Sequence, residues 1–193
     1  MNVLVLGCGL VGRPMALDLA SEDDFNVTIA DINLKNLKKI PSTLPIKKVQ
    51  KDLSNPDQLK SLFKKCDIVI NAVPGFMGFN TLKEIIKAKK NVVDIAFFPE
   101  DPFELDELAK QNNVTAIVDC GVAPGMSNLL TGYINSILDK TETILIFVGG
   151  LPIERDYPFE YKAGFSPIDV IEEYLRPARY IENKKLIIRP ALS

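Results

Sequence analysis

The opening of the chain combines an apolar run with a glycine pattern that few folds accommodate. Residues 3–6 are all aliphatic, and Gly7, Gly9 and Gly12 follow them before an amphipathic stretch that starts at Met15. A strand, a glycine turn and a helix in this order make the spacing G-x-G-x-x-G typical of dinucleotide binding. The first glycine allows the tight turn, the second lets a pyrophosphate approach the backbone, and the third lets helix and strand pack closely. The N-terminus of the helix then offers N–H groups to phosphate oxygens.

An acidic residue lies at the distance that this motif predicts. Asp31 ends a second apolar run at 27–30 and follows Gly12 by nineteen positions, close to the spacing of about 20 for a carboxylate that binds the adenosine ribose. This carboxylate would repel a 2′-phosphate, and no arginine comes directly after it, although Lys35 is near. We therefore expect NAD rather than NADP as the cofactor. The alternative is that Asp31 only caps the helix that follows it.

Charge and hydropathy exclude several classes of partner. The formal net charge is −2, which gives no electrostatic basis for binding nucleic acid or an anionic membrane. No apolar run approaches the roughly 18 residues that a membrane span requires. Because the first strand starts almost at Met1, we expect no signal peptide and a cytoplasmic location.

Cysteine and histidine usage narrows the chemistry. The three cysteines, Cys8, Cys66 and Cys120, form no CxxC pair, and the chain has no histidine. A disulfide framework or a metal site is therefore not expected, and a reducing compartment fits this pattern. Histidine-based triads and imidazole-ligated zinc are excluded within this chain. A general acid or base must then be Asp, Glu, Lys, Tyr or Cys.

Strand-like and helix-like patterns alternate through the first 120 or so residues. Besides the helix after the glycine motif, the patterns predict strands at 3–6, 27–30, 46–50, 67–72, 91–95 and 114–118 and helices at 33–39, 56–63, 79–88 and 102–111. Apolar strands joined by helices predict a parallel sheet covered on both faces. The expected fold class is α/β, with a Rossmann doubly wound parallel sheet.

The pattern changes after residue 122. Apolar residues from Met126 to Leu138 at helical spacing predict a substantially buried helix. A long apolar strand at 143–148, a stretch rich in proline and aromatic residues at 151–167, a helix at 168–175 and a strand at 185–189 are expected next. We expect residues 1–122 to form an NAD-binding Rossmann domain and residues 123–193 to begin an α+β substrate and dimerisation domain that is incomplete here. Covering the edge of the strand at 143–148 favours a homodimer.

Loops after the strands hold the candidate binding residues, because ligands of a doubly wound sheet lie across the carboxyl ends of its strands. Asp52 could reach the adenine amino group, or only start a helix. The small residues after Asn71 could let the second ribose of the cofactor lie close to the backbone, or they could form an ordinary turn. Asp94 could lie near the nicotinamide ribose or the substrate, or cap its strand. The candidate cofactor-binding residues are Gly7, Gly9, Leu10, Val11, Gly12, Asp31, Asp52, Asn71, Ala72, Val73 and Asp94.

The segment 119–128 joins the last expected Rossmann strand to the apolar helix. Its two glycines and its proline indicate a constrained loop, and the start of the helix could receive an anionic group such as an α-carboxylate. We expect it to line the substrate cleft through Cys120, Gly121, Pro124, Gly125, Ser127 and Asn128. The alternative is a rigid interdomain crossover. Cys120 is not expected to be a nucleophile, because no histidine is available to activate it and a small buried thiol is the commoner role.

Several segments together resemble one family. They are VLGCGLVGRP, VINAVPG, DCGVAPGMSNLLTGY, VGGLP and FSPIDVIEEYLRPARYIENKK, and they are similar to the saccharopine dehydrogenase superfamily, with GVAPGMSN most similar to L-lysine 6-dehydrogenases. The resemblance implies NAD-linked oxidation of an amine-bearing carbon of an amino acid through an imine. It carries Gly7, Gly9, Gly12 and Asp31 over to the cofactor and 119–128 to the cleft where nicotinamide meets substrate.

The substrate amine must be neutral before hydride can leave its carbon. Asp94, Asp119 and Lys162 are the candidate catalytic bases. Two alternatives stay open at this point. One is a sister enzyme resembling saccharopine or carboxynorspermidine dehydrogenases, and the other is an NAD-binding module without catalysis, if the chain ends at Ser193.

Overall fold

The computed structural model describes residues 1–150, 152–158 and 160–193, which form two compact units, Met1–Val148 and Gly149–Ser193. Leu151 and Phe159, within the predicted proline- and aromatic-rich stretch, lie outside the described residues. Among the described residues, no helix has the length and apolar character that crossing a bilayer would require.

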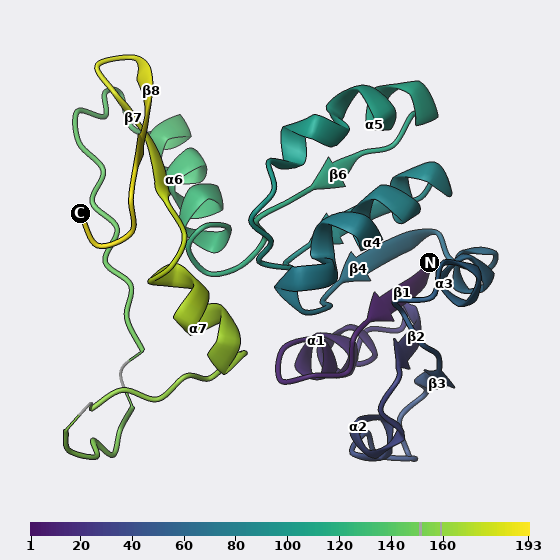
Figure 1. Ribbon diagram of the computed structural model, residues 1–193. Helices are drawn as coiled ribbons and strands as arrows, with labels where there is room; N and C mark the ends of the chain where they lie inside the picture. Colours follow the sequence, from purple (N-terminus) through teal and green to yellow (C-terminus); the bar gives the residue numbers. More distant parts are fainter. Residues whose placement is uncertain (151, 159) are drawn as a thin grey trace. The chain divides into compact units, whose positions relative to one another are not determined.

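A single six-stranded parallel sheet organises the first unit (Figure 1). Its strands are β1 (Asn2–Leu6), β2 (Asn26–Asp31), β3 (Lys47–Gln50), β4 (Ile68–Asn71), β5 (Asn91–Asp94) and β6 (Ala116–Ile117), in the order β3-β2-β1-β4-β5-β6. The strand order reverses between β1 and β4, which is the switch point at which doubly wound sheets bind ligands. The predicted Rossmann fold is confirmed.

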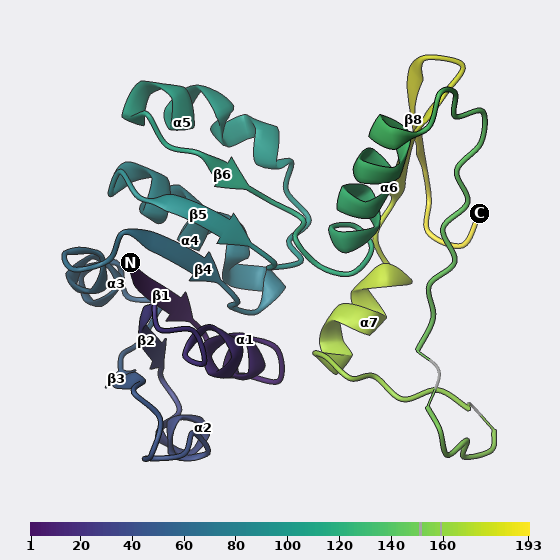
Figure 2. The ribbon, with the colours of Figure 1, turned by 180° about the vertical axis from the view of Figure 1, so that it is seen from behind.

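Helices cover both faces of this sheet and create two apolar cores (Figure 2). The helices are α1 (Gly12–Leu19), α2 (Leu34–Lys38), α3 (Pro56–Phe63), α4 (Gly75–Lys87) and α5 (Asp106–Asn112), with the 3₁₀ turn η1 (Pro102–Leu105) before α5. Strand β1 shows the cause of the two cores, because successive side chains of a strand point to opposite faces. Val3 and Val5 pack with residues of α1 and α2, whereas Leu4 and Leu6 pack with residues of α3 and α4.

Three predicted elements differ in their bounds. Helix α4 begins at Gly75, four residues before the predicted start at 79. Its early turns include Gly78, which allows close packing: a Cβ on Gly78 would lie 2.7 Å from Ala96 Cβ and 2.7 Å from Phe98 Cδ1. The helix predicted at 102–111 is divided into η1 and α5. Strand β6 pairs with β5 over two residues only, so the strand predicted at 114–118 is shorter than expected.

Two predictions beyond β6 are wrong. The helix α6 (Met126–Ile137) forms as expected, but its apolar stripe is exposed rather than buried, with 74% of Leu129 and 64% of Tyr133 accessible. Residues 143–148 form no strand, because no neighbouring segment supplies backbone hydrogen bonds to them within the described residues. The edge that would have favoured a homodimer is therefore absent.

The second unit contains a helix and a hairpin. Its elements are α7 (Pro167–Glu173), β7 (Ala178–Glu182) and β8 (Lys185–Arg189), with β7 and β8 antiparallel. The helix and β8 were predicted, but β7 was not. Asn183 and Lys184 join the strands with φ of 51° and 64°, the left-handed backbone that two-residue hairpin turns require. The compact units divide after Val148, and a functional boundary after Val122 stays a prediction.

Close backbone packing of α1 onto β1 predicts that Gly12 tolerates no side chain. A Cβ there would collide with the Gly7 carbonyl oxygen and lie 3.1 Å from Ala72 Cβ. We expect Gly12→Ala to lower the free energy of unfolding by about 1–3 kcal/mol or more, as overpacking does, in urea unfolding followed by circular dichroism. Gly132→Ala in α6 is the control, because a Cβ at that position meets nothing within 4 Å. Equal urea midpoints for Gly12→Ala and the unmodified chain would contradict the packing argument.

Candidate functional site

The three glycines of the first loop have distinct surroundings. Gly7 has a φ of 99° and donates its N–H to the Ala30 carbonyl at 2.8 Å. A Cβ on Gly7 would collide with the Ala72 carbonyl oxygen, whereas a Cβ on Gly9 would meet nothing within 4 Å. Gly7 and Gly12 are therefore required by packing, and Gly9 leaves open space above the backbone. This is the division of roles that the motif predicts.

The start of α1 is free to receive an anion. Its N-cap residue, Val11, makes no side-chain cap hydrogen bond, and the neighbouring Leu10 is exposed. The first N–H groups of a helix have no intrahelical partner, and the helix dipole is positive at that end. The glycine loop and the first turn of α1 thus offer a cradle of the kind that holds a pyrophosphate.

Asp31 ties the glycine loop to the end of β2. Its Oδ2 accepts the N–H of Cys8 at 2.7 Å, and its Oδ1 accepts the N–H of Asn33 at 2.6 Å. The N-cap residue of α2 is Asn33, whose side chain accepts the Lys35 N–H, so Asp31 is not that helix's cap. Each carboxylate oxygen has further lone pairs, which leaves Asp31 able to accept ribose hydroxyls as well.

Three cations act electrostatically on Cys8 in the glycine loop. Burial raises the pKa of the Cys8 thiol and Asp31 raises it further, while Arg13, Lys39 and Lys48 act in the opposite direction. These three cations are therefore close enough to act electrostatically on the loop where phosphates would bind. The sequence analysis did not select Arg13, although its position directly after Gly12 in the first helical turn was a usable signal.

The residues after β4 meet the glycine loop. Ala72 donates its N–H to the Leu6 carbonyl at 2.9 Å, and its own carbonyl fills the space that Gly7 leaves free. Val73 is buried behind it. The predicted cofactor-binding residues of β1 and β4 are thus brought together at the switch point.

Asp94 is the most perturbed ionisable group at this edge. Only 1% of it is exposed, its Oδ2 accepts from Asn71 Nδ2 at 2.7 Å, and its Oδ1 accepts from the Ala96 N–H at 2.7 Å. Burial raises the pKa of Asp94 to about 7, because desolvation and the charge of Asp119 outweigh the two hydrogen bonds that lower it. A carboxyl group this buried is positioned to act through its neighbours rather than by touching a substrate.

Asp52 has local partners. Its Oδ1 accepts from the N–H and the hydroxyl of Ser54, at 2.9 and 2.6 Å, and these bonds lower the pKa of Asp52. Its own N–H donates to Gln58 Oε1 at 3.1 Å. The carboxylate thus orders the turn before α3, and a contact with adenine stays a prediction.

The segment 119–128 is tightly folded. Asp119 has a φ of 55° and Gly125 a φ of 128°, Gly121 and Gly125 form a β-bridge, and the Ala123–Pro124 peptide is cis. Asn128 Oδ1 accepts the Gly125 N–H at 3.1 Å and the hydroxyl of Ser127 at 3.1 Å, which caps the start of α6. Gly121, Pro124 and Asn128 are exposed, so they can line a surface that a substrate reaches.

Cys120 and Lys162, two further candidate residues, have different surroundings in the structure. Burial, Asp94 and Asp119 all raise the pKa of the Cys120 thiol, which makes it a poor nucleophile, as expected. Lys162 belongs to the second unit, where its Nζ lies 2.8 Å from Asp156 Oδ2. Its catalytic role stays a prediction.

A separate hollow of about 330 Å³ lies between α4, η1, α5 and β6. Its walls are largely apolar, with Leu82, Ile86 and Phe103 among them. None of the predicted site residues lines it. The chemistry-bearing groups of the first unit gather instead at the carboxyl edge of the sheet.

Comparison with known proteins points to one family over nearly the whole chain. A family model described as the saccharopine dehydrogenase NADP binding domain matches residues 3–117, and one described as the saccharopine dehydrogenase C-terminal domain matches residues 121–193. The chain is 28% identical to "Saccharopine dehydrogenase [NADP(+), L-glutamate-forming]" of Saccharomyces cerevisiae, over 96% of this chain and 43% of that protein. It is also 28% identical to the mitochondrial alpha-aminoadipic semialdehyde synthase of Rattus norvegicus, over 96% of this chain and 21% of that protein.

A solved structure shows the same architecture over nearly the whole chain. Apo saccharopine dehydrogenase (L-Glu forming) from Saccharomyces cerevisiae superposes with a TM-score of 0.72 at 25% identity, covering 98% of this chain and 44% of that one. The chain therefore spans less than half the length of these relatives.

The burial of Asp94 predicts how stability depends on pH. With its folded pKa raised from 3.8 to about 7, the folded state holds a proton that the unfolded state releases, so this contribution to stability is lost as pH rises from about 4 to about 7. We expect Asp94→Asn to be more stable than the unmodified chain at pH 8, by up to about 4 kcal/mol, and the difference to shrink towards pH 4. Urea unfolding at several pH values measures this, and a difference that does not change with pH would contradict it.

Proposed function

The chain belongs to the saccharopine dehydrogenase family, and from this membership we propose that the protein is an NAD-dependent oxidoreductase acting on the CH–NH or CH–NH₂ group of an amino acid. The observation that carries the proposal is the glycine loop with its uncapped helix start, joined to Asp31 at the carboxyl edge of the sheet. The space above Gly9 and the cations around the loop suit a dinucleotide pyrophosphate.

The protein contributes to the reaction by binding and orienting the cofactor and the substrate. When bound, the nicotinamide cofactor supplies the hydride acceptor. The loop and the start of α1 would hold the pyrophosphate, Asp31 the adenosine ribose, and the backbone after Asn71 the second ribose. The oxidised substrate carbon becomes an imine, which water hydrolyses.

Asp119 is the base that we favour. The substrate amine must lose a proton before its carbon can release hydride, so a carboxylate near the substrate end of the edge is useful. Asp119 is exposed, follows the end of β6 by two residues and acts electrostatically on the buried Asp94. Lys162 is the second candidate for this base.

Free lysine is the substrate that we favour, because GVAPGMSN is most similar to L-lysine 6-dehydrogenases. The chain also resembles proteins named saccharopine dehydrogenase and alpha-aminoadipic semialdehyde synthase, so a secondary amine of the saccharopine type is an equally supported substrate. A carboxynorspermidine-type substrate is the third member of this group. A nucleotide-binding module without catalysis is the alternative from a different class.

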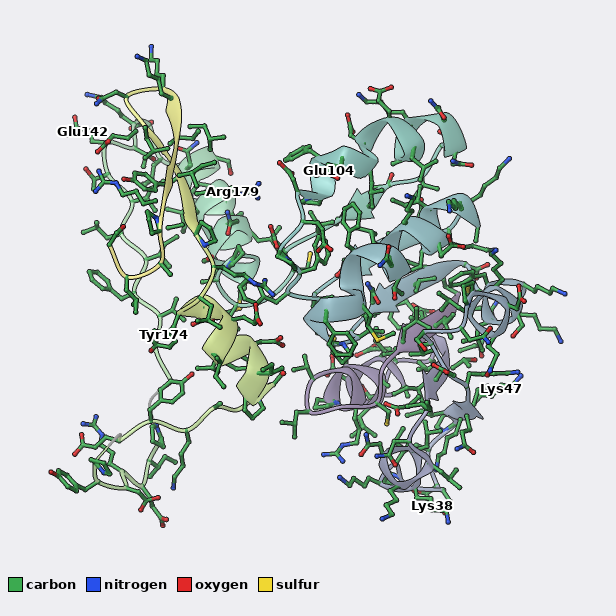
Figure 3. All side chains as sticks on the ribbon, in the orientation of Figure 1. Lys38, Lys47, Glu104, Glu142, Tyr174 and Arg179 are labelled. Atoms are coloured by element: carbon green, nitrogen blue, oxygen red, sulfur yellow. The ribbon has the colours of Figure 1, made fainter. Side chains whose placement is uncertain are left out.

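The cofactor preference that we propose differs from the family model's description. That description and the yeast relative's name both specify NADP. Here the Asp31 carboxylate lies at the end of β2, where it would repel a 2′-phosphate. Figure 3 shows the side chains of Lys38 on α2 and Lys47 on β3 extending outward from these elements.

A homodimer and a cytoplasmic location complete the proposal. The ground for a dimer is now the exposed apolar stripe of α6, since surfaces of this kind usually meet a partner. Light scattering measures the mass, and a monomer at micromolar concentration would contradict the dimer.

Substrate oxidation is tested by following absorbance at 340 nm with NAD and, in separate assays, lysine, saccharopine and carboxynorspermidine. We expect turnover with lysine, and a fall of about 10²-fold or more in kcat for Asp119→Ala, which is the usual share of a general base. Asp57→Ala, on the exposed first turn of α3, is the matched control. NAD binding without turnover on any of the three amines would favour the non-catalytic module.

Cofactor preference is tested by replacing Asp31. In Asp31→Asn the negative charge is lost while one amide oxygen can still accept a backbone N–H, so we expect the ratio of kcat/KM for NAD over NADP to fall by about tenfold. Asp57→Asn should leave the ratio unchanged. An unmodified protein that uses NADP better than NAD would overturn the proposed preference.

A further inference from the structure

Asn71 and Asp94 form a buried pair on neighbouring strands. Each is the last residue of its strand, and they lie directly opposite each other in the β4–β5 register. Asn71 is 0% exposed and Asp94 is 1% exposed. The hydrogen bond of 2.7 Å between them is therefore fully withdrawn from water.

The charge of Asp94 and the side-chain oxygen of Asn71 both lack a partner among the described residues. Asp94 accepts two hydrogen bonds, but no cation pairs with it among the described residues. Asn71 Oδ1 is buried and accepts no hydrogen bond from the described residues. A buried charge without a counter-charge and a buried acceptor without a donor both cost free energy.

One proton would change this balance. If Asp94 carried a proton on Oδ2, an Asn71 amide turned by 180° could accept it through Oδ1, because amide oxygen and nitrogen are interchangeable in shape. The pair therefore has two hydrogen-bonded arrangements that differ by one proton. One is charged, and the other is neutral.

The surroundings of the pair favour a titration in the neutral range. Asp119, after β6, repels the charge of Asp94, and Cys120 beside it has its own pKa raised by both carboxylates. Helix α4 contributes the Gly78 carbonyl, 3.4 Å from Asn71 Nδ2, and the turn after β5 contributes the Ala96 N–H; neither carries a charge. The chain has no histidine, the side chain that ordinarily titrates near pH 7.

Backbone hydrogen bonds connect the pair to the ligand-binding edge. The Asp94 carbonyl accepts the Cys120 N–H at 3.0 Å, and the Asn71 carbonyl accepts the Ile95 N–H at 3.0 Å. The next residue after Asn71, Ala72, packs on the glycine loop. A charge on Asp94 therefore lies at the same edge as the loop that would hold the dinucleotide.

We propose that the Asn71–Asp94 pair makes the protein distinguish oxidised from reduced nicotinamide cofactor, with Asp94 as a positioning residue whose charge favours the oxidised form. The inference rests on the proposed function. An oxidised nicotinamide ring carries a positive charge, and a reduced ring does not. Binding the cationic ring stabilises ionised Asp94, whose proton passes to bulk solvent. By linkage, oxidised cofactor binds more tightly when Asp94 is already ionised.

Calorimetric titration with NAD⁺ and NADH between pH 6 and pH 8 tests the proposal. In the unmodified chain we expect the NAD⁺ affinity to rise on the order of tenfold over this range and the NADH affinity to stay nearly constant. Repeating the NAD⁺ titration at pH 7 in buffers of different ionisation enthalpy should show release of about half a proton for each NAD⁺ bound.

Three variants isolate the charge. Asp94→Asn has the same shape and no titratable group, so its NAD⁺ affinity should be independent of pH. Asp119→Asn removes the repelling charge and should move the pH dependence to lower pH. Asp101→Asn is the matched control, because Asp101, like Asp94, accepts the backbone N–H of the residue two positions later. This variant should leave the pH dependence of NAD⁺ affinity unchanged.

A second readout needs no cofactor. The Ala96 amide proton bonds to Asp94 Oδ1, so its NMR shift should titrate near neutral pH in the unmodified chain and not in Asp94→Asn. If Ala96 titrates but NAD⁺ affinity does not change with pH, or changes equally in Asp94→Asn, the proposal is overturned and the proposed function stands. If neither cofactor binds at any pH, the proposed function fails and the proposal fails with it.

Discussion

The close backbone approach of β1, β4 and α1 is the constraint on which the rest of the site depends. Gly7 turns the chain with a positive φ, its missing side chain leaves room for the Ala72 carbonyl, and Gly12 lets α1 rest on the Gly7 carbonyl. This contact fixes where the first helix starts and where β4 ends. It therefore places the free N–H groups of α1 beside the loop after Asn71. A side chain at either glycine would separate the parts that together form the switch point.

A second constraint is that no cation pairs with Asp94 among the residues that the structure describes. Other carboxylates of this unit pair with lysines, as Glu84 does with Lys87, or accept hydrogen bonds near the surface, as Asp52 does in the turn before α3. Asp94 instead lies in the interior between Asn71 and Ala96. A carboxyl group whose pKa lies near the pH of the solution changes its protonation in response to a nearby charge far more than an exposed carboxylate does. We therefore expect the pair, although it is buried, to respond to the charge of a ligand bound at this edge of the sheet.

Most of the Rossmann unit could be predicted, because its signals are local. Glycine spacing, apolar runs and the position of Asp31 depend only on residues close in sequence. Helix α4 was predicted too short because glycines such as Gly78 disfavour a helix in the sequence pattern, and the packing of Gly78 against Ala96 and Phe98 is visible only in the fold. Strand 143–148 failed for a related reason: an apolar run forms a strand only where another segment pairs with it. The Asn71–Asp94 pair could not be predicted as a pair, since its partners are twenty-three residues apart and only the strand register brings them together.

The central claim is that the carboxyl edge of the sheet, and not another surface, binds the dinucleotide. An amide NMR shift map recorded during titration with NAD⁺ tests it most directly, because it reports each backbone position separately. The account predicts shift changes concentrated at residues 9–13, 31–33, 72–75 and 94–96. Changes concentrated instead around the hollow between α4, η1, α5 and β6, or no changes at saturating NAD⁺, would contradict it.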